Sequence, residues 1–207
     1  MRIGGFLPLS LCDYPGIPAA VVFTQGCNFR CPFCHNGRLV SRVSVEGQLI
    51  PEAEVLERLR IRRPALDGVV LSGGEPTLQP DLPRFIALVK SMGYLVKLDT
   101  NGSHPEVLEM LIRDRLVDCV AMDIKAAPDY YAALSGLPAP PMEAVRESVR
   151  LLAAGAVQFY FRTTMVPALH RPDEKDRIRA WLPPDAPWRE QVFQPENALH
   201  PGLRRAV

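Results

Sequence analysis

The chain has 207 residues, of which 47% are hydrophobic, and it carries 24 basic against 23 acidic side chains. This length can bury one substantial core, so we expect a single domain over residues 1–207. The net charge of +1 gives no reason to expect a nucleic acid or a membrane surface as partner. No stretch approaches the roughly 18 apolar residues of a membrane-spanning helix, and the N-terminus does not resemble a secretion signal. An odd number of cysteines argues against a disulfide framework, so we expect a reducing, cytoplasmic location.

Short apolar segments alternate with amphipathic ones along most of the chain. The apolar segments predict strands at residues 19–24, 68–72, 94–98, 117–122 and 157–164, with a stub of a sixth strand at 192–193. The amphipathic segments predict helices at residues 51–62, 81–92, 105–113, 142–153 and 173–182.

Strands that alternate with helices are typical of a parallel sheet with right-handed crossovers. Five or six such units are too few for the eight of a closed barrel. The sequence therefore predicts an α/β fold, a partial, open (β/α)6-type parallel barrel. A short proline-rich tail follows from about residue 183.

Three of the five cysteines, Cys27, Cys31 and Cys34, lie within eight residues, directly after the first predicted strand. Thiolates this close on one loop can converge on a soft metal centre. A structural zinc site and a fully ligated iron–sulfur cube both need four protein ligands, whereas three cysteines leave one iron of a cube open for chemistry. The alternative is a zinc site completed by His35, although adjacent Cys34 and His35 are awkward ligands for one tetrahedral ion.

Polar side chains follow the predicted strands, at the end of the barrel where active sites form. They are Gly73, Gly74 and Glu75 after the second strand, Asp99 and Asn101 after the third, Asp123 and Lys125 after the fourth, and Arg162 in the fifth. If these residues only capped turns, independent strand ends would not so regularly carry carboxylates, amides and a lysine. We therefore expect one site built from several strands.

The chemistry of this set suits one kind of ligand. Glu75, presented by a flexible Gly-Gly turn, can accept hydrogen bonds from an amine. Asp99 can accept them from ribose hydroxyls, and Lys125 can pair with a carboxylate. Together they suit a ligand with an amino-acid end and a nucleoside end. Each residue also has an ordinary explanation, as a turn, a cap or a surface ion pair.

The motif C-x3-C-x-aromatic-C, with Phe33 as the aromatic residue, resembles the cluster motif of the radical S-adenosylmethionine (SAM) superfamily. Gly73-Gly74-Glu75 resembles its amino-group motif. Longer segments resemble the glycyl-radical-enzyme activating enzymes, above all the anaerobic ribonucleoside-triphosphate reductase activating proteins. These segments are residues 9–16, which contain D-Y-P-G, and residues 23–36, 98–102 and 122–125. The resemblance covers roughly residues 4–167.

This resemblance implies that Cys27, Cys31 and Cys34 hold a [4Fe–4S] cluster whose open iron binds SAM. One electron from the cluster would release methionine and a 5′-deoxyadenosyl radical, and this radical would take hydrogen from a glycine of a partner enzyme. The implied partner is the anaerobic ribonucleotide reductase, and the implied electron donor is a flavodoxin or ferredoxin.

The resemblance also implies contacts with SAM. The implied contact residues are Phe33, Gly73, Gly74, Glu75, Asp99, Asn101, Asp123 and Lys125. Phe33 would lie by the adenine, Glu75 at the amine and Lys125 at the carboxylate. In some activating enzymes the aspartates that match Asp99 and Asp123 also bind a monovalent cation. His35 and Asn36 would lie at the mouth of the site.

Two other functions remain open at this point. The first is a radical SAM enzyme that acts on a small molecule, as the compact 7-carboxy-7-deazaguanine synthases do; the sequence Cys34-His35-Asn36 favours an activating enzyme instead. The second is a non-catalytic metal scaffold, which would leave the polar residues after the strands without a use.

Overall fold

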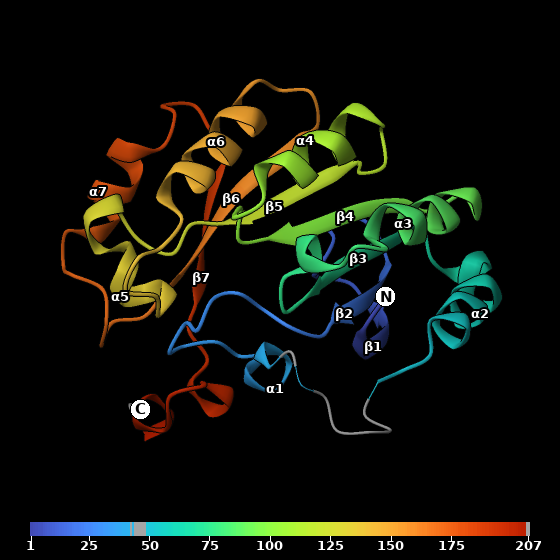
Figure 1. Ribbon diagram of the computed structural model, residues 1–207, viewed down its shortest axis with the longest axis horizontal. Helices are drawn as coiled ribbons and strands as arrows, with labels where there is room; N and C mark the ends of the chain where they lie inside the picture. The colour runs from blue at the N-terminus through green and yellow to red at the C-terminus, as the bar shows by residue number, and fades with distance from the viewer. Residues whose placement is uncertain (42, 44–48, 206–207) are drawn as a thin grey trace.

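The computed structural model describes residues 1–41, 43 and 49–205 (Figure 1). Within them one seven-stranded sheet follows the order of the sequence. Its strands are β1 (Ile3–Ser10), β2 (Ala19–Thr24), β3 (Gly68–Gly73), β4 (Leu95–Thr100), β5 (Cys119–Asp123), β6 (Gln158–Met165) and β7 (Trp188–Val192). Strands β2 to β7 are parallel, and β1 pairs antiparallel with β2.

The described helices lie mostly in an arc outside the curved sheet, as Figure 1 shows. They are α1 (Gly37–Val40), α2 (Glu52–Arg62), α3 (Leu82–Ser91), α4 (Pro105–Arg113), α5 (Tyr131–Ser135), α6 (Met142–Ala153) and α7 (Glu174–Trp181). None of the helices in the described ranges is long and apolar enough to cross a membrane.

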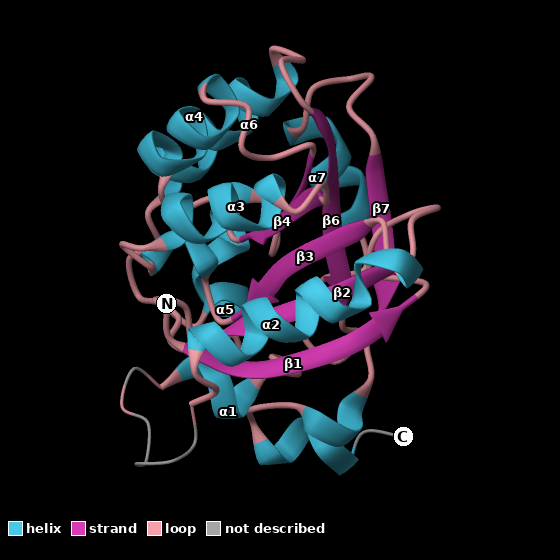
Figure 2. Cartoon of the chain, turned by 90° about the vertical axis from the view of Figure 1, so that its right-hand side faces the viewer, coloured by secondary structure: helices cyan, strands magenta, loops and turns pink. Residues whose placement is uncertain are grey.

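The predicted open, parallel α/β barrel is confirmed, and six of its strands are the parallel ones. Two strands differ from the prediction. No strand was expected at Ile3–Ser10, whose two glycines and one proline are unfavourable inside a sheet. Strand β1 tolerates them because it lies at an edge of the sheet (Figure 2).

The last strand was also predicted wrongly, as a stub near residues 192–193. It is β7, which covers five residues and lies inside the segment taken for a tail. Its sequence is polar and four of its five residues are exposed, so it offers no apolar run to recognise.

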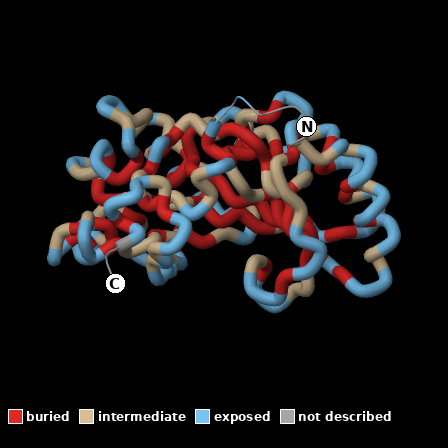
Figure 3. The backbone as a smooth tube through the Cα atoms, turned by 90° about the horizontal axis from the view of Figure 1, so that it is seen from below, coloured by how far each residue is buried: buried red, intermediate tan, exposed pale blue. Residues whose placement is uncertain are grey.

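The sheet has a largely apolar outer face and a mixed inner face, because side chains alternate along a strand. Outward residues such as Leu71, Leu98 and Phe161 are buried against the helices, and the buried core follows the sheet in Figure 3. Inward residues form a second, smaller cluster that includes Tyr14 and Tyr160. Tyr14 belongs to the D-Y-P-G segment, so this segment closes the inside of the barrel at the amino ends of the strands.

Candidate active site

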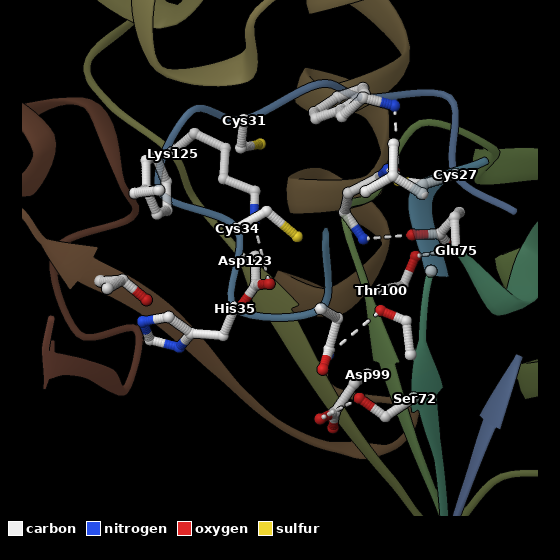
Figure 4. A pocket seen from close by; sticks show the side chains of 18 of the residues that line it. Cys27, Cys31, Cys34, His35, Ser72, Glu75, Asp99, Thr100, Asp123 and Lys125 are labelled. Atoms are coloured by element: carbon white, nitrogen blue, oxygen red, sulfur yellow. Dashed lines mark hydrogen bonds and ion pairs between the residues drawn. The ribbon is translucent and has the colours of Figure 1, made fainter. Parts of the chain in front are cut away.

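One cavity lies at the carboxyl ends of the strands and encloses about 830 Å³, including the part that is open to solvent. Every residue that the sequence analysis assigned to the cluster or to SAM lines this cavity, together with His35, Asn36 and Arg162. In Figure 4, Cys31, Cys34, Asp123 and Lys125 lie on one side, and Cys27, Glu75 and Thr100 lie on the other. The fold thus gathers residues that lie as far apart in the chain as Cys27 and Arg162.

The loop that carries the three cysteines is held by backbone hydrogen bonds from distant elements. The N–H of Cys27 donates to the carbonyl of Val40 at 3.0 Å, and the N–H of Arg30 donates to Ser135 of α5 at 2.9 Å. Within the loop, the N–H of Cys34 donates to the carbonyl of Cys31 at 3.1 Å. The thiols are therefore presented by a loop with defined backbone partners.

The turn after β3 needs its two glycines because it runs against the start of the cysteine loop. The N–H of Gly74 donates to Thr24 and that of Glu75 to Gly26, both at 2.9 Å. A Cβ at Gly74 would lie 2.1 Å from the carbonyl oxygen of Gly26. Gly73 has φ +109°, a conformation that side chains other than glycine rarely adopt. The Gly-Gly pair thus joins the two motifs sterically.

The three thiols have the chemistry of cluster ligands. All five cysteines of the chain are free. Burial raises the pKa of Cys27 to about 11 and that of Cys31 to about 12, so both thiols are protonated near neutral pH when no metal is bound. The N–H of Phe29 already donates to Cys27 Sγ at 3.4 Å, the type of contact that supports a thiolate on a cluster.

A cluster fits this loop better than one zinc ion does. Across the described part of the chain, no three His, Cys, Asp or Glu side chains are grouped to hold a metal ion. A cluster spreads its thiolates over several irons, so they need not meet at one point. His35, the candidate fourth zinc ligand, instead accepts a hydrogen bond at Nε2 from the N–H of Gln194 at 3.2 Å.

Glu75 is 1% exposed and is surrounded by hydrogen-bond donors. Burial raises its pKa, and the hydrogen bonds from Thr77, Asn101 and Thr100 oppose that rise. Its Oε1 accepts from the hydroxyls of Thr77 and Thr100 at 2.6 and 2.8 Å. Its Oε2 accepts from the N–H of Asn101 at 2.7 Å. Glu75 therefore connects the loop after β4 to the turn after β3. Its Oε2 can accept one further hydrogen bond.

Asp99 and Asp123 belong to a chain of alternating charges across the floor of the cavity. Arg162 donates from Nε to Asp123 at 2.7 Å and from Nη1 to Asp99 at 3.3 Å. Lys125 Nζ lies 3.0 Å from the second oxygen of Asp123, and Lys97 pairs with Asp99. Burial would raise the pKa of Asp123, but Arg162 and Lys125 outweigh it and hold this pKa well below its usual range.

Two further predicted residues have partners at the cavity wall. Phe33 is 5% exposed, and Lys125 Nζ lies 5.9 Å from the centre of its ring. Asn101 donates from Nδ2 to Asn28 Oδ1 at 2.9 Å, and the same nitrogen lies 4.0 Å from Cys27 Sγ. Asn101 thus connects the loop after β4 with the first cysteine.

The sequence analysis did not single out Ser72, Lys97 or Thr100, although all three hold site carboxylates. Lys97 is fully buried and lies two residues before Asp99 on β4. Strand alternation puts both side chains on the inner face, so a lysine two residues before a strand-end aspartate was the available signal. Ser72 and Thr100 carry no comparable signal, because short hydroxyl residues are common at strand ends.

The family of the chain follows from comparison with known proteins. The family described as the Radical SAM superfamily matches residues 21–178. The chain belongs to the radical SAM superfamily.

Within that superfamily, relatives that match most of this chain and most of their own length identify a narrower family. The pyruvate formate-lyase-activating enzyme of Clostridium pasteurianum is 32% identical over 86% of this chain and 73% of its own length. A Methanocaldococcus jannaschii protein, provisionally named a glycyl-radical enzyme activating enzyme, is 33% identical over 95% of this chain and 81% of its own length. The chain is thus a member of the glycyl-radical enzyme activating family.

Solved structures support the fold. The crystal structure of Streptococcus suis SuiB bound to the precursor peptide SuiA has a TM-score of 0.64 at 15% identity over 84% of this chain. A structure of TYW1 with a lysine-pyruvate adduct has a TM-score of 0.56 at 18% identity over 75% of this chain. The chain spans 39% and 59% of these two proteins.

Proposed function

We propose that this chain activates a glycyl radical enzyme by cleaving SAM at a [4Fe–4S] cluster. The observation that carries the proposal is the shared cavity, in which three free thiols lie beside the residues that suit the two ends of SAM. The cluster supplies, when bound, the electron that divides SAM into methionine and a 5′-deoxyadenosyl radical.

The residues of the chain would position these groups. Cys27, Cys31 and Cys34 hold the cluster, with the N–H of Phe29 on the first sulfur. Lys125 carries a positive charge, because its pairing with Asp123 outweighs burial and raises its pKa, and so it can bind the methionyl carboxylate.

The amine and nucleoside ends of SAM have their own proposed contacts. Glu75 Oε2 accepts from the amine, together with the backbone of Gly73 and Gly74. Asp99 and Asn101 take positions near the ribose. Phe33 lines the wall that an adenine would contact.

The monovalent cation that some activating enzymes bind remains a prediction for this chain. In the described residues all four carboxylate oxygens of Asp99 and Asp123 already have protein partners. A cation bound by these aspartates would therefore share their oxygens with Arg162, Lys97, Lys125 or Ser72.

We propose the anaerobic ribonucleotide reductase as partner, a flavodoxin or ferredoxin as electron donor, and the cytoplasm as location. The wider class of partner rests on the relatives, of which the Methanocaldococcus jannaschii protein is named for the activation of a glycyl-radical enzyme. The ribonucleotide reductase itself rests on the motifs in residues 9–16 and 23–36.

A small-molecule reaction is the second candidate. A 7-carboxy-7-deazaguanine synthase of Methanopyrus kandleri is 35% identical, but over only 54% of this chain and 51% of its own length. The activating enzymes match far more of the chain, which favours the first candidate.

The test is anaerobic reconstitution with iron and sulfide, reduction with dithionite and addition of SAM. Formation of 5′-deoxyadenosine that is lost in the Cys31→Ala variant is the expected result. A glycyl radical signal in electron paramagnetic resonance, seen only with the co-incubated reductase, would identify the partner. A chain that binds zinc, or that holds a cluster indifferent to SAM, would overturn the proposal.

A further inference from the structure

The C-terminal segment 193–204 lies against the cysteine loop, although the two are about 160 residues apart in sequence (Figure 1). The ring of Phe193 stacks on His35 with 5.7 Å between centroids and 15° between planes. The next residue, Gln194, donates its N–H to His35 Nε2 at 3.2 Å. Both contacts fall on the residue that directly follows Cys34.

A second set of contacts lies on the other side of the loop. The N–H of His200 donates to the carbonyl of Pro32 at 2.8 Å, directly after Cys31. Leu199 lies against Gly37, where an added Cβ would come within 3.1 Å of its Cδ1. The segment thus contacts Pro32 and His35, the residues that follow Cys31 and Cys34, and also Gly37 at the start of α1.

The segment is anchored, because part of it belongs to the main core. Ala198 is fully buried and Leu203 is 7% exposed, and both join the cluster that contains Cys31 and Phe33. Arg204 Nε donates to the carbonyl of Ala198 at 2.7 Å, which closes the segment on itself. An anchored segment can restrain the loop that it contacts.

We propose that residues 193–204 position the cluster ligands Cys31 and Cys34, with Phe193 acting through His35 as the principal positioning residue. This proposal rests on the proposed function only for the identity of the cluster. The contacts between residues 193–204 and the cysteine loop do not depend on it. Cys27 depends on the segment less, since Val40 and Phe29 hold it.

The first experiment uses the full chain without cluster and needs no iron. Each cysteine is alkylated with iodoacetamide under reducing conditions, and the rate is followed by mass spectrometry of its peptide. Cys12, which is exposed, gives the reference rate of the reagent with an accessible thiol. Cys119, which is buried inside the barrel, becomes reactive when the whole chain unfolds.

In the Phe193→Ala variant, the rates of alkylation of Cys31 and Cys34 should rise about three- to tenfold. The reason is that loss of the stacked Phe193–His35 pair lowers the free energy of opening the loop locally. Cys27 should change less, and Cys119 should not change. Phe193→Tyr should restore the slow rates, because it keeps the ring. Val192→Ala is the matched control, since Val192 directly precedes Phe193 and is itself 86% exposed.

The second experiment uses the reconstituted protein and follows bleaching of the cluster absorbance in the presence of an iron chelator. Phe193→Ala and Leu199→Ala should lose the cluster faster than wild type, and Val192→Ala should not. Unchanged alkylation of Cys31 and Cys34 in Phe193→Ala would overturn the inference, and so would a parallel rise at Cys119. A wild-type chain that takes up no cluster would instead count against the proposed function, while the alkylation rates would still decide the role of the segment.

Discussion

At the scale of single residues, the site depends on positions where another residue type could not make the same contacts. Gly74 has no room for a side chain, because a Cβ would meet the carbonyl of Gly26. Arg162 joins two aspartates that come from different strands. Both residues act on the site through the backbone or through charge, and neither is a ligand of the cluster.

Gly74→Ala should push the turn after β3 away from the cysteine loop. Overpacking of this kind costs about 1–3 kcal/mol in the free energy of unfolding. Urea unfolding would measure the loss, and the iron content after reconstitution should fall as well. Gly5→Ala is a suitable control, since the φ of Gly5 is not positive and an added Cβ would lie at ordinary contact distance, 3.4 Å, from the ring of Phe23. Normal stability and iron content in Gly74→Ala would contradict the steric argument.

Arg162→Gln should make the free energy of unfolding depend less on pH in the acid range. The folded pKa of Asp123 is lowered, so its ionised form adds stability above about pH 4 that is lost as the pH falls. Removing one partner of a buried ion pair costs about 3–5 kcal/mol, and somewhat less here because these side chains are partly exposed. The difference from wild type should therefore be large at neutral pH and shrink below about pH 4.

Urea unfolding of both proteins over this pH range would measure the effect. Arg189→Gln is the control, because Arg189 lies opposite Arg162 on β7 and stacks on Tyr160 instead. A difference between wild type and Arg162→Gln that stays constant with pH would show that Asp123 does not depend on Arg162.

At the scale of elements, the helices hold the loops that form the site. Ser148 of α6 is fully buried and donates its hydroxyl to the carbonyl of Gly102 at 2.8 Å. Gly102 directly follows Asn101, so α6 fixes the loop that carries an expected SAM contact.

Ser148→Ala should leave the carbonyl of Gly102 without this donor. A buried group that loses its partner costs about 1–3 kcal/mol, and SAM affinity should fall as the loop loosens. Calorimetric melting and equilibrium binding of SAM would measure the two effects. Ser91→Ala removes the same type of bond, from an exposed hydroxyl to Leu88, and should change little. Equal effects of both substitutions would contradict a specific role for α6.

The sequence predicted most elements of the barrel because their apolar faces repeat with the period of a helix or a strand. It predicted the composition of the cavity because parallel strands end at one edge. It missed β1 and placed β7 as a stub at its C-terminal end, because the residues of both strands do not alternate clearly and both are held by pairing at the edges of the sheet. It also missed α1 and α5, which are too short to show a period.

Within the site, the sequence could name residue types but not their partners. It suggested Asp99 and Asp123 separately, and only the fold shows that Arg162 joins them. It left His35 as a possible zinc ligand, whereas a segment near the C-terminus engages its ring. Such contacts depend on distant segments, and no local pattern in the chain records them.

At the scale of the whole molecule, the cluster should stabilise the fold, because a ligand that binds only the folded state shifts unfolding by mass action. Reconstituted protein should therefore melt at a higher temperature than the protein without cluster, and a chelator should reverse the shift. Cys31→Ala should abolish it, whereas Cys12→Ala should not, since Cys12 is exposed at the end of β1. A cluster that leaves the melting temperature unchanged would show that the cysteine loop is not coupled to global folding.

The cysteine loop depends on parts of the chain that are made at very different times. Its cysteines leave the ribosome about 160 residues before the segment that contacts Pro32 and His35. A nascent chain therefore carries three thiols without the segment that later lies against them. The complete site can form only after residues 193–204 have been translated.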